Sequence, residues 1–243
     1  MIIYGLHPVL EALRAGRATA LRVSRRDDPR LREVLRLAAG QGLSIERVEL
    51  GELDRATRGA AHQGVVAHLG EAPELAVSDL VAAAAVPPLL VVLDGIEDPQ
   101  NLGAILRAAD AAGADGVIRQ ARHAAPLGGA AAKASAGAVA HVRIATVVNV
   151  ARALEELRRL GVWTAGLAVD ATQTVYDVDF TLPTAVVFGA EGTGLRRLVR
   201  ERCDVLASIP MQGHVGSLNV AAAAAVVLFE AVRQRRGGMA SSA

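Results

Sequence analysis

Short apolar runs alternate with longer amphipathic or alanine-rich runs from residue 89 to the end of the chain. The apolar runs favour β-strands at 89–93, 116–118, 142–145, 162–167, 185–188 and 205–209. The intervening runs favour helices at 102–112, 129–135, 150–160, 194–202 and 218–235. Because a strand that is apolar on both faces needs helices on both sides, this alternation predicts an α/β fold with a mainly parallel sheet.

Residues 1–70 predict a separate, smaller α/β unit. Strand-like segments at 21–24, 44–49 and 62–68 alternate with helix-like segments at 4–16, 29–39 and 50–57. Pro73, Pro87 and Pro88 bracket the next stretch, which has the composition of a linker with one helical turn. We therefore expect an N-terminal domain at 1–70, a linker at 71–88 and a second domain at 89–243.

The composition indicates a cytoplasmic protein with a substantial core. Hydrophobic residues make up 52% of the 243 positions, which is enough for the core of one or two domains. No signal peptide is recognisable, and Cys203 is the single cysteine, so an internal disulfide is excluded. The apolar run at 220–229 is shorter than the roughly 20 residues that cross a bilayer, so no membrane association is expected.

Positive charge is concentrated in the N-terminal part of the chain. Residues 1–70 carry 11 arginines and 8 acidic residues, whereas the whole chain has a net charge of +1. This excess is a weak indication that the N-terminal part binds nucleic acid. Lys133 is the single lysine, and its sequence context leaves open whether it lines a site or lies on a helix surface.

Three loops at expected strand ends carry the candidate chemistry. The first follows strand 89–93 and contains Asn101, Gly103 and Arg107. Asn101 and Arg107 would lie roughly 120° apart on a continuous helix, so they converge only if Asn101 lies at the helix cap. Gly103 permits the close approach of a ligand or of another segment.

The second loop, at 188–194, is glycine-rich and contains one carboxylate, Glu191. It lacks the Lys-Ser/Thr pair of a P-loop and the glycine pattern of a dinucleotide site, so we exclude both. The third loop, at 213–219, precedes the last helix, where Ser217 is the expected N-cap and Asn219 follows it. A strand, a glycine loop and a helix start in this order are typical of a ligand site in α/β proteins.

Other reactive residues show no comparable pattern. The six histidines have no metal-like spacing, so no metal site is expected. Cys203 has no base beside it in the sequence, and we interpret it as structural.

The three loops together resemble a known family. Their sequences are DPQNLGAILRAAD at 98–110, FGAEGTGL at 188–195 and IPMQGHVGSLNVA at 209–221. In order and spacing they resemble motifs one, two and three of the SpoU branch of the SPOUT RNA methyltransferases, over residues 89–235. YGLHPVLEAL at 4–13 and HQGVVA at 62–67 resemble the L30e-like substrate-binding domain that precedes the catalytic domain in this branch.

The resemblance implies a deep trefoil knot at the C-terminal end, an obligate homodimer and S-adenosylmethionine as the cofactor. It implies cofactor contacts at Gly189, Ile209 and Leu218. It also implies a catalytic set that consists of Asn101, Arg107, Glu191, Ser217 and Asn219. The chain departs from the family at Gly216, where many members carry a second serine.

The whole chain resembles the members of this branch that methylate the ribose 2′-oxygen of a guanosine in the peptidyl transferase region of 23S rRNA, either naked or in an early assembly precursor. The reaction needs an aligned attack and removal of the hydroxyl proton. Arg107 acts either as the base or, as a permanently protonated guanidinium, as a stabiliser of the developing alkoxide. Alternatives are a tRNA loop, the rRNA site of thiostrepton resistance, or a non-catalytic RNA-binding protein.

Overall fold

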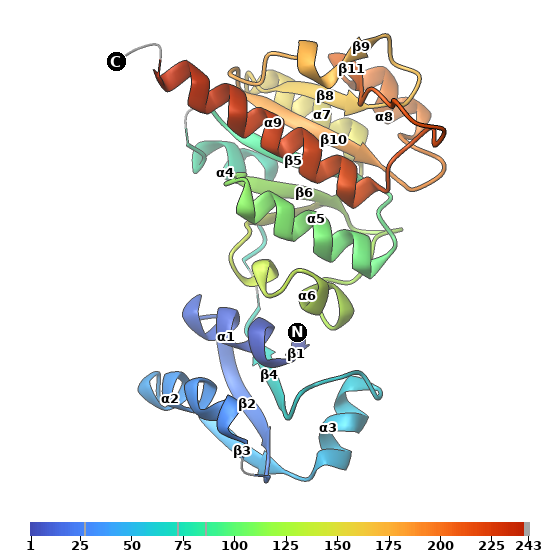
Figure 1. Ribbon diagram of the computed structural model, residues 1–243. Helices are drawn as coiled ribbons and strands as arrows, with labels where there is room; N and C mark the ends of the chain where they lie inside the picture. Colours follow the sequence, from blue (N-terminus) through green and yellow to red (C-terminus); the bar gives the residue numbers. More distant parts are fainter. Residues whose placement is uncertain (27, 72, 86, 241–243) are drawn as a thin grey trace.

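The computed structural model describes residues 1–26, 28–71, 73–85 and 87–240, which form two β-sheets with helices around each (Figure 1). The N-terminal sheet has four strands in the order β1-β4-β2-β3. These strands are β1 (Ile2–Tyr4), β2 (Ala18–Ser24), β3 (Ser44–Val48) and β4 (Val65–Leu69). The surrounding helices are α1 (Leu6–Arg14), α2 (Arg32–Gly40) and α3 (Leu50–Thr57), with a 3-10 turn at Pro29–Leu31.

Two details of the N-terminal sheet differ from the predicted pattern. Residues 2–4 form β1, which is too short to show a period of two in the sequence. β4 begins at Val65 instead of His62, because Gln63 and Gly64 have φ values of 54° and 80° and form a turn. The predicted alternation of strands and helices is otherwise confirmed.

The second sheet has seven strands in the order β7-β6-β5-β10-β8-β11-β9, and every pairing is parallel. Its strands are β5 (Leu89–Asp94), β6 (Gly116–Gln120), β7 (Ile144–Val147), β8 (Trp163–Leu167), β9 (Gln173–Thr174), β10 (Thr184–Gly189) and β11 (Val205–Ser208). The prediction of a mainly parallel α/β sheet is therefore confirmed. Only the two-residue β9 has no counterpart among the predicted strands.

Helices cover both faces of this sheet, as its apolar strands require (Figure 1). They are α4 (Val77–Ala82), α5 (Pro99–Ala111), α6 (Ala130–Ala134), α7 (Val150–Arg159), α8 (Arg197–Arg202) and α9 (Val220–Ala240). Val91 and Leu93 of β5 pack with α5 and α9, whereas Leu90 and Val92 pack with α4 and α7. With both faces covered, the strand ends remain as the place for a site.

Capping residues decide where two of these helices begin. α5 starts at Pro99, three residues earlier than predicted, because the Asp98 carboxylate accepts hydrogen bonds from backbone N–H groups of the first turn. α9 starts at Val220, and the Asn219 side chain accepts from the backbone N–H groups of the next residues. The expectation that Ser217 caps this helix is therefore wrong: Asn219 is the cap.

The N-terminal domain packs directly against residues 128–141, which include α6. The backbone N–H of Gly129 donates to the carbonyl of Ile2 at 3.1 Å. Lys133 Nζ donates to the carbonyl of Ala61 at 3.4 Å, so the single lysine bridges the two parts of the chain. One continuous hydrophobic cluster also includes side chains from both sheets. The N-terminal domain is therefore held in place by packing, in addition to its covalent connection. Part of the predicted linker, α4, packs on the seven-stranded sheet.

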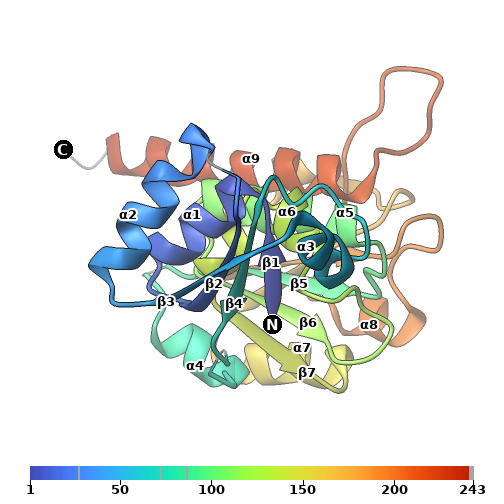
Figure 2. The same cartoon turned by 90° about the horizontal axis from the view of Figure 1, so that it is seen from below.

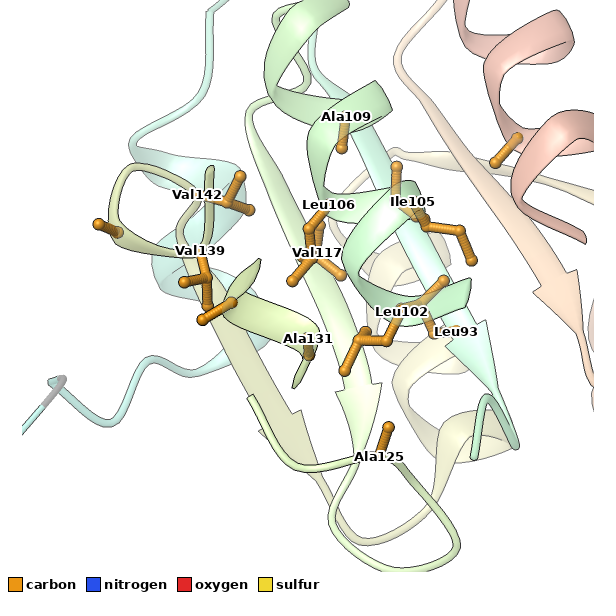
Figure 3. Packing of buried hydrophobic residues seen from close by; sticks show 14 of the residues in the cluster. Leu93, Leu102, Ile105, Leu106, Ala109, Val117, Ala125, Ala131, Val139 and Val142 are labelled. Atoms are coloured by element: carbon orange, nitrogen blue, oxygen red, sulfur yellow. The ribbon is translucent and has the colours of Figure 1, made fainter. Parts of the chain in front are cut away.

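Gly103 lies at the closest approach of α5 and α6. A Cβ atom at this position would lie 2.5 Å from the carbonyl oxygen of Ala131 and 2.5 Å from Ala134 Cβ. Figure 3 shows the surrounding cluster, in which Leu102 and Leu106 of α5 pack with Val117 of β6. The segment that approaches Gly103 is therefore α6, and no ligand is needed to explain the glycine.

We expect Gly103→Ala to lower the free energy of unfolding by about 1–3 kcal/mol, because the extra methyl group overpacks the contact between α5 and α6. Urea denaturation followed by circular dichroism measures this change. Gly51→Ala is the control, because Gly51 is helical and has open space around it. The control should be neutral or stabilising. Equal stability of Gly103→Ala and the unsubstituted protein would contradict the close contact.

Candidate active site

A cavity of about 790 Å³ lies at the carboxyl edge of the parallel sheet, where β8, β10 and β11 end. Two loops form most of its wall, one at 188–195 after β10 and one at 208–219 between β11 and α9. Figure 2 shows the loop at 208–219 projecting from the body of the domain ahead of α9. The cavity has the size of a typical small-molecule pocket.

The cavity brings together residues from the second and third motifs. Gly189, Ile209 and Leu218, which the family resemblance implies as cofactor contacts, all line it. Glu191, Ser217 and Asn219 of the implied catalytic set also line it, as do apolar side chains such as Phe188. The wall thus combines an apolar surface, glycine-rich backbone and carboxylates.

The second loop folds tightly over the end of β10. A Cβ atom on Gly189 would lie 2.1 Å from the backbone carbon of Gly194 and 2.3 Å from the nitrogen of Leu195. Ala190 and Gly194 exchange two backbone hydrogen bonds across the turn, at 2.9 and 3.1 Å. Only glycine fits at position 189. Residues 190–194 form the turn and are not helical, so α8 starts at Arg197, later than predicted.

Asn101 connects the three motifs by hydrogen bonds. Its Nδ2 donates to Glu191 Oε2 at 3.0 Å, and its Oδ1 accepts from Asn219 Nδ2 at 2.8 Å. The Oδ1 atom of Asn219 is used by the cap of α9. Asn101 is only 8% exposed and lies within α5, whose cap is Asp98. The orientation of both amides follows from this chain of bonds.

The two other predicted catalytic residues are placed differently. Ser217 lies in the exposed part of the third loop and lines the cavity, so its hydroxyl is free to meet a substrate. Arg107 is exposed on α5 and does not line the cavity. It makes no hydrogen bond or ion pair within the described part of the chain. Within a single copy of the protein, Asn101, Glu191 and Asn219 therefore come together, but Arg107 does not reach them.

An ion pair between a buried carboxylate and an exposed arginine, which the sequence patterns did not reveal, supports the second loop. Asp94 is fully buried at the end of β5, where it accepts from the backbone N–H of Arg196 at 2.9 Å and from Arg196 Nε at 2.7 Å. Arg196 Nη2 also donates to Gln120 Oε1 at 2.8 Å. Because an unpaired buried carboxylate is costly, this pair holds the loop against the sheet. An Asp at a strand end and an Arg after a glycine loop were its only sequence signals.

A second, smaller cavity of about 330 Å³ lies in the N-terminal domain, between residues 24–31 and 59–64. Arg26, Arg30, His62 and Gln63 line it, together with the carboxylates of Asp28 and Asp54. Arg30 is ion-paired with Asp28. His62 Nε2 lies 3.1 Å from Asp54 Oδ1, so its ring is fixed in the wall. This surface offers cations and hydrogen-bonding groups to a ligand, and the positive excess of residues 1–70 lies in the same domain.

We also inspected the described residues for a metal site, a reactive thiol and a membrane-spanning helix. These residues contain no cluster of three His, Cys, Asp or Glu that could hold a metal ion. Burial, aided by the negative charge of Asp204, raises the pKa of the Cys203 thiol to about 12, which agrees with a structural role. In the same part of the chain, no helix is long and apolar enough to cross a membrane.

Comparison with known proteins identifies the family. Residues 88–229 match the model of the SpoU rRNA Methylase family. The chain belongs to this family. Residues 2–75 match a second model, RNA 2′-O ribose methyltransferase substrate binding. The family resemblance inferred from the three motifs is thus confirmed, and with it the SPOUT fold class.

Relatives of this SpoU methylase align over nearly its whole length. It is 44% identical over 240 residues to the 23S rRNA (guanosine-2′-O-)-methyltransferase RlmB of Pseudomonas putida, with 96% of each chain covered. It is 45% identical over 239 residues to RlmB of Vibrio cholerae, covering 96% of this chain and 97% of the relative. A solved structure of AviRb from Streptomyces viridochromogenes with AdoMet superposes with a TM-score of 0.82, 30% identity and coverage of 98% and 91%.

Asn101→Asp should disrupt the cavity of this SpoU methylase. The new carboxylate would face Glu191 where an amide N–H now donates, so two like charges would push the first and second loops apart. We expect affinity for S-adenosylmethionine to fall about tenfold or more at pH 8, as measured by calorimetry. Because like charges raise the pKa of a carboxyl pair, part of this affinity should return at pH 5.5.

The matched control is Asn149→Asp, which makes the same substitution at the cap of α7. Asn149 Oδ1 accepts from the backbone N–H of Arg152, and an aspartate caps a helix equally well. This variant should bind the cofactor like the unsubstituted protein. If Asn101→Asp also bound normally at pH 8, the hydrogen-bonded connection would not control the cavity.

Proposed function

We propose that the protein transfers a methyl group from S-adenosylmethionine to the ribose 2′-oxygen of a guanosine in the peptidyl transferase region of 23S rRNA. The observation that carries the proposal is the similarity, over nearly the whole chain, to relatives described as 23S rRNA guanosine 2′-O-methyltransferases. The substrate is naked rRNA or an early assembly precursor, so the reaction takes place in the cytoplasm.

The composition of the cavity supports S-adenosylmethionine as the ligand. Apolar wall residues such as Phe188 and Leu218 suit its adenosine, and the carboxylate of Glu191 suits its positive charge. Asp170 also lines the cavity, but it is ion-paired with Arg200. Gly189, Ile209 and Leu218 would hold the molecule. When bound, it supplies an electrophilic methyl group.

The residues of the chain have separate tasks in this reaction. Ser217, exposed at the cavity, orients the ribose hydroxyl. Asn101, Glu191 and Asn219 keep the loops in register through their hydrogen bonds. Arg107 stabilises the alkoxide that develops as the hydroxyl loses its proton, and it neutralises the adjacent phosphate. This role suits a guanidinium better than that of a base, because the group stays protonated at working pH.

The position of Arg107 supports a homodimer in which Arg107 of one subunit acts at the cavity of the other. Arg107 and Phe229, the latter 50% exposed, lie on the solvent side of the packed helices α5 and α9. Ala222 and Val226 of α9 leave a shallow surface that lets another helix approach. Such an apolar surface is typical of a subunit contact. Val227 of the same helix is buried inside its own chain and takes no part in this contact.

N-terminal residues select the RNA in this proposal. The domain from 1 to 70 carries the positive excess and the cavity with Arg26 and Arg30. Folded rRNA offers unpaired loop bases and a shape that such a surface can read. The alternative substrate is a tRNA loop or the thiostrepton-site rRNA, for which the same chemistry would suffice. A non-catalytic RNA-binding role is disfavoured by the intact set of motif residues.

Methylation of total RNA with labelled S-adenosylmethionine tests this function. We expect label in 23S rRNA, on one guanosine of the peptidyl transferase region, as mapped by nuclease digestion and mass spectrometry. If only tRNA were labelled, the substrate would be a tRNA and not 23S rRNA. Absence of methyl transfer to any RNA would favour the non-catalytic alternative.

Arg107→Ala should separate catalysis from cofactor binding. Arg107 lies outside the cavity of its own chain, so calorimetric affinity for S-adenosylmethionine should be nearly unchanged. The methylation rate should fall by about 10²–10³, the usual loss for one electrostatic group at a transition state. A variant that loses cofactor affinity would place Arg107 in the binding site instead.

Subunit mixing tests whether Arg107 acts across the dimer. Leu218→Arg puts a cation in the cavity wall and should prevent binding of the positively charged cofactor. Arg107→Ala and Leu218→Arg chains, each inactive alone, should regain activity when they are refolded together, because one cavity of the mixed dimer has an intact wall and faces an intact Arg107. Failure to regain activity in purified mixed dimers would mean that Arg107 acts within its own chain.

Phe229→Asp should weaken the dimer, because the charge replaces a half-exposed aromatic side chain at the proposed contact. Light scattering at micromolar concentration should give a dimer mass for the unsubstituted protein and a monomer mass for the variant. Tyr176→Asp, at another exposed aromatic residue, is the control and should remain dimeric. A monomeric mass for the unsubstituted protein would refute the proposed homodimer.

A further inference from the structure

Arg119 is a buried arginine without a counterion. It is the fourth residue of β6 and is only 7% exposed. Its Nε donates to the neighbouring carbonyl of Gln120 at 3.3 Å, which is the one side-chain hydrogen bond that it makes within the described residues. No Asp or Glu of this part of the chain comes within ion-pair distance of it. Burial accordingly lowers the pKa of Arg119, with no carboxylate to oppose the effect.

Two other arginines, Arg196 and Arg235, show which acceptors Arg119 lacks. Arg196 is paired with Asp94 and Gln120. Arg235 donates to four backbone carbonyls, at Pro87, Pro88, Phe180 and Leu182. Arg119 has no such set of acceptors for its two terminal NH₂ groups. Because an uncompensated charge is costly in a protein interior, an apolar side chain would be the more stable choice at this place.

The terminal nitrogens of Arg119 nevertheless reach the surface. No buried side-chain nitrogen or oxygen of the described residues lacks a hydrogen-bond partner, so nitrogens without a partner must be accessible to solvent. The guanidinium of Arg119 therefore keeps a small contact with solvent, although the residue as a whole is only 7% exposed. A cation fixed in this way has several N–H groups in a rigid plane, the geometry that binds a phosphate in two parallel hydrogen bonds.

Thr146 provides a second donor beside this guanidinium. It is opposite Arg119 in the parallel register of β6 and β7, so the two side chains are neighbours on one face of the sheet. Thr146 is exposed, and its hydroxyl makes no hydrogen bond within the described residues. The loop after β6 adds two exposed residues, Arg122 and His123, the latter 3.5 Å from Glu97. Arg122 has no such partner in the described part of the chain.

This group of donors lies between the cofactor cavity and the N-terminal domain. β6 is separated from β10, which carries the cavity loop, by β5 alone, so the distance across the sheet is about 9–10 Å. The segment that follows β6, residues 128–141, contacts the N-terminal domain. An RNA that extends from the N-terminal domain to the cavity of the same chain by the shortest route across the sheet would pass this edge.

We propose that Arg119 and Thr146 form a phosphate-binding site for the RNA backbone, next to the nucleotide that is methylated. The inference rests on the proposed function, because it assumes an RNA substrate. The phosphate supplies the counterion that Arg119 lacks inside the protein. Arg119 is thus a positioning residue, which sets the path of the RNA between the N-terminal domain and the cavity and takes no part in methyl transfer.

Arg119→Met tests the site, because methionine preserves the apolar stem and removes the charge. Affinity for a 23S rRNA fragment should fall about ten- to a hundredfold, the usual effect of losing a hydrogen-bonded charge. The slope of log K against log salt should become shallower by about one unit. Affinity for S-adenosylmethionine should not change. Arg159→Met is the control, since Arg159 is exposed at the end of α7, away from the carboxyl edge, and both RNA quantities should stay constant.

A second measurement covers the case in which Arg119→Met does not fold. Thr146→Val keeps the shape of an exposed side chain and removes the hydroxyl, and it should weaken RNA binding about three- to tenfold. In a phosphate-free buffer, inorganic phosphate should raise the melting temperature of the unsubstituted protein, with a smaller rise for Thr146→Val. An equal rise in both proteins would mean that phosphate binds elsewhere.

The outcomes separate this inference from the proposed function. If Arg119→Met and Thr146→Val bind the rRNA fragment with unchanged affinity and salt slope while the unsubstituted protein methylates 23S rRNA, the phosphate site is refuted alone. If the salt slope depends on Arg119 but no RNA is methylated, the site stands and the proposed methylation fails.

Discussion

The hydrogen bonds of a single amide hold the candidate active site together. Asn101 lies 90 residues from Glu191 and 118 from Asn219 along the sequence, and it bonds to both. Each amide atom has one partner, so the network leaves no freedom to exchange donor and acceptor. Asn219 also caps α9, and this cap couples the position of the last helix to the shape of the cavity. A site built from three separate loops needs such a connection, because loops by themselves are the most mobile parts of a fold.

The parallel sheet determines where this network can lie. Apolar strands require helices on both faces, and these helices leave the strand ends as the accessible edge. The ion pair between the buried Asp94 and Arg196 holds the second loop at this edge. The tight turn at Gly189 brings the backbone of that loop to the cavity. The N-terminal domain is packed against residues 128–141, so its distance from the cavity is set by contacts as well as by the linker. Arg119 lies on the path between them.

Much of the fold could be predicted because it follows from local patterns. Apolar runs of strand length, helical periodicity and glycine turns correctly indicated the parallel sheet and nearly all its elements. The helix boundaries were less predictable, because a helix cap depends on where one side chain points. Asp98 caps α5 earlier than expected, and Asn219, not Ser217, caps α9. The short β1 and β9 exist only because a neighbouring strand pairs with them, and no period can be read from two or three residues.

The sequence by itself determined the family, because the motifs combine particular residue types at fixed spacings. It also pointed to six residues that line the cavity, namely Gly189, Glu191, Ile209, Ser217, Leu218 and Asn219. Only the tertiary structure decided which of the predicted residues contact one another. Asn101 connects the loops from within a helix, whereas Arg107, six residues later, points away from them, since six residues leave two side chains about 120° apart on a helix. The pairing of Asp94 with Arg196 and the missing partner of Arg119 were likewise invisible in the sequence. The partner of a charged group is set by contacts between residues that are far apart in the sequence. Such contacts cannot be deduced from the local sequence pattern.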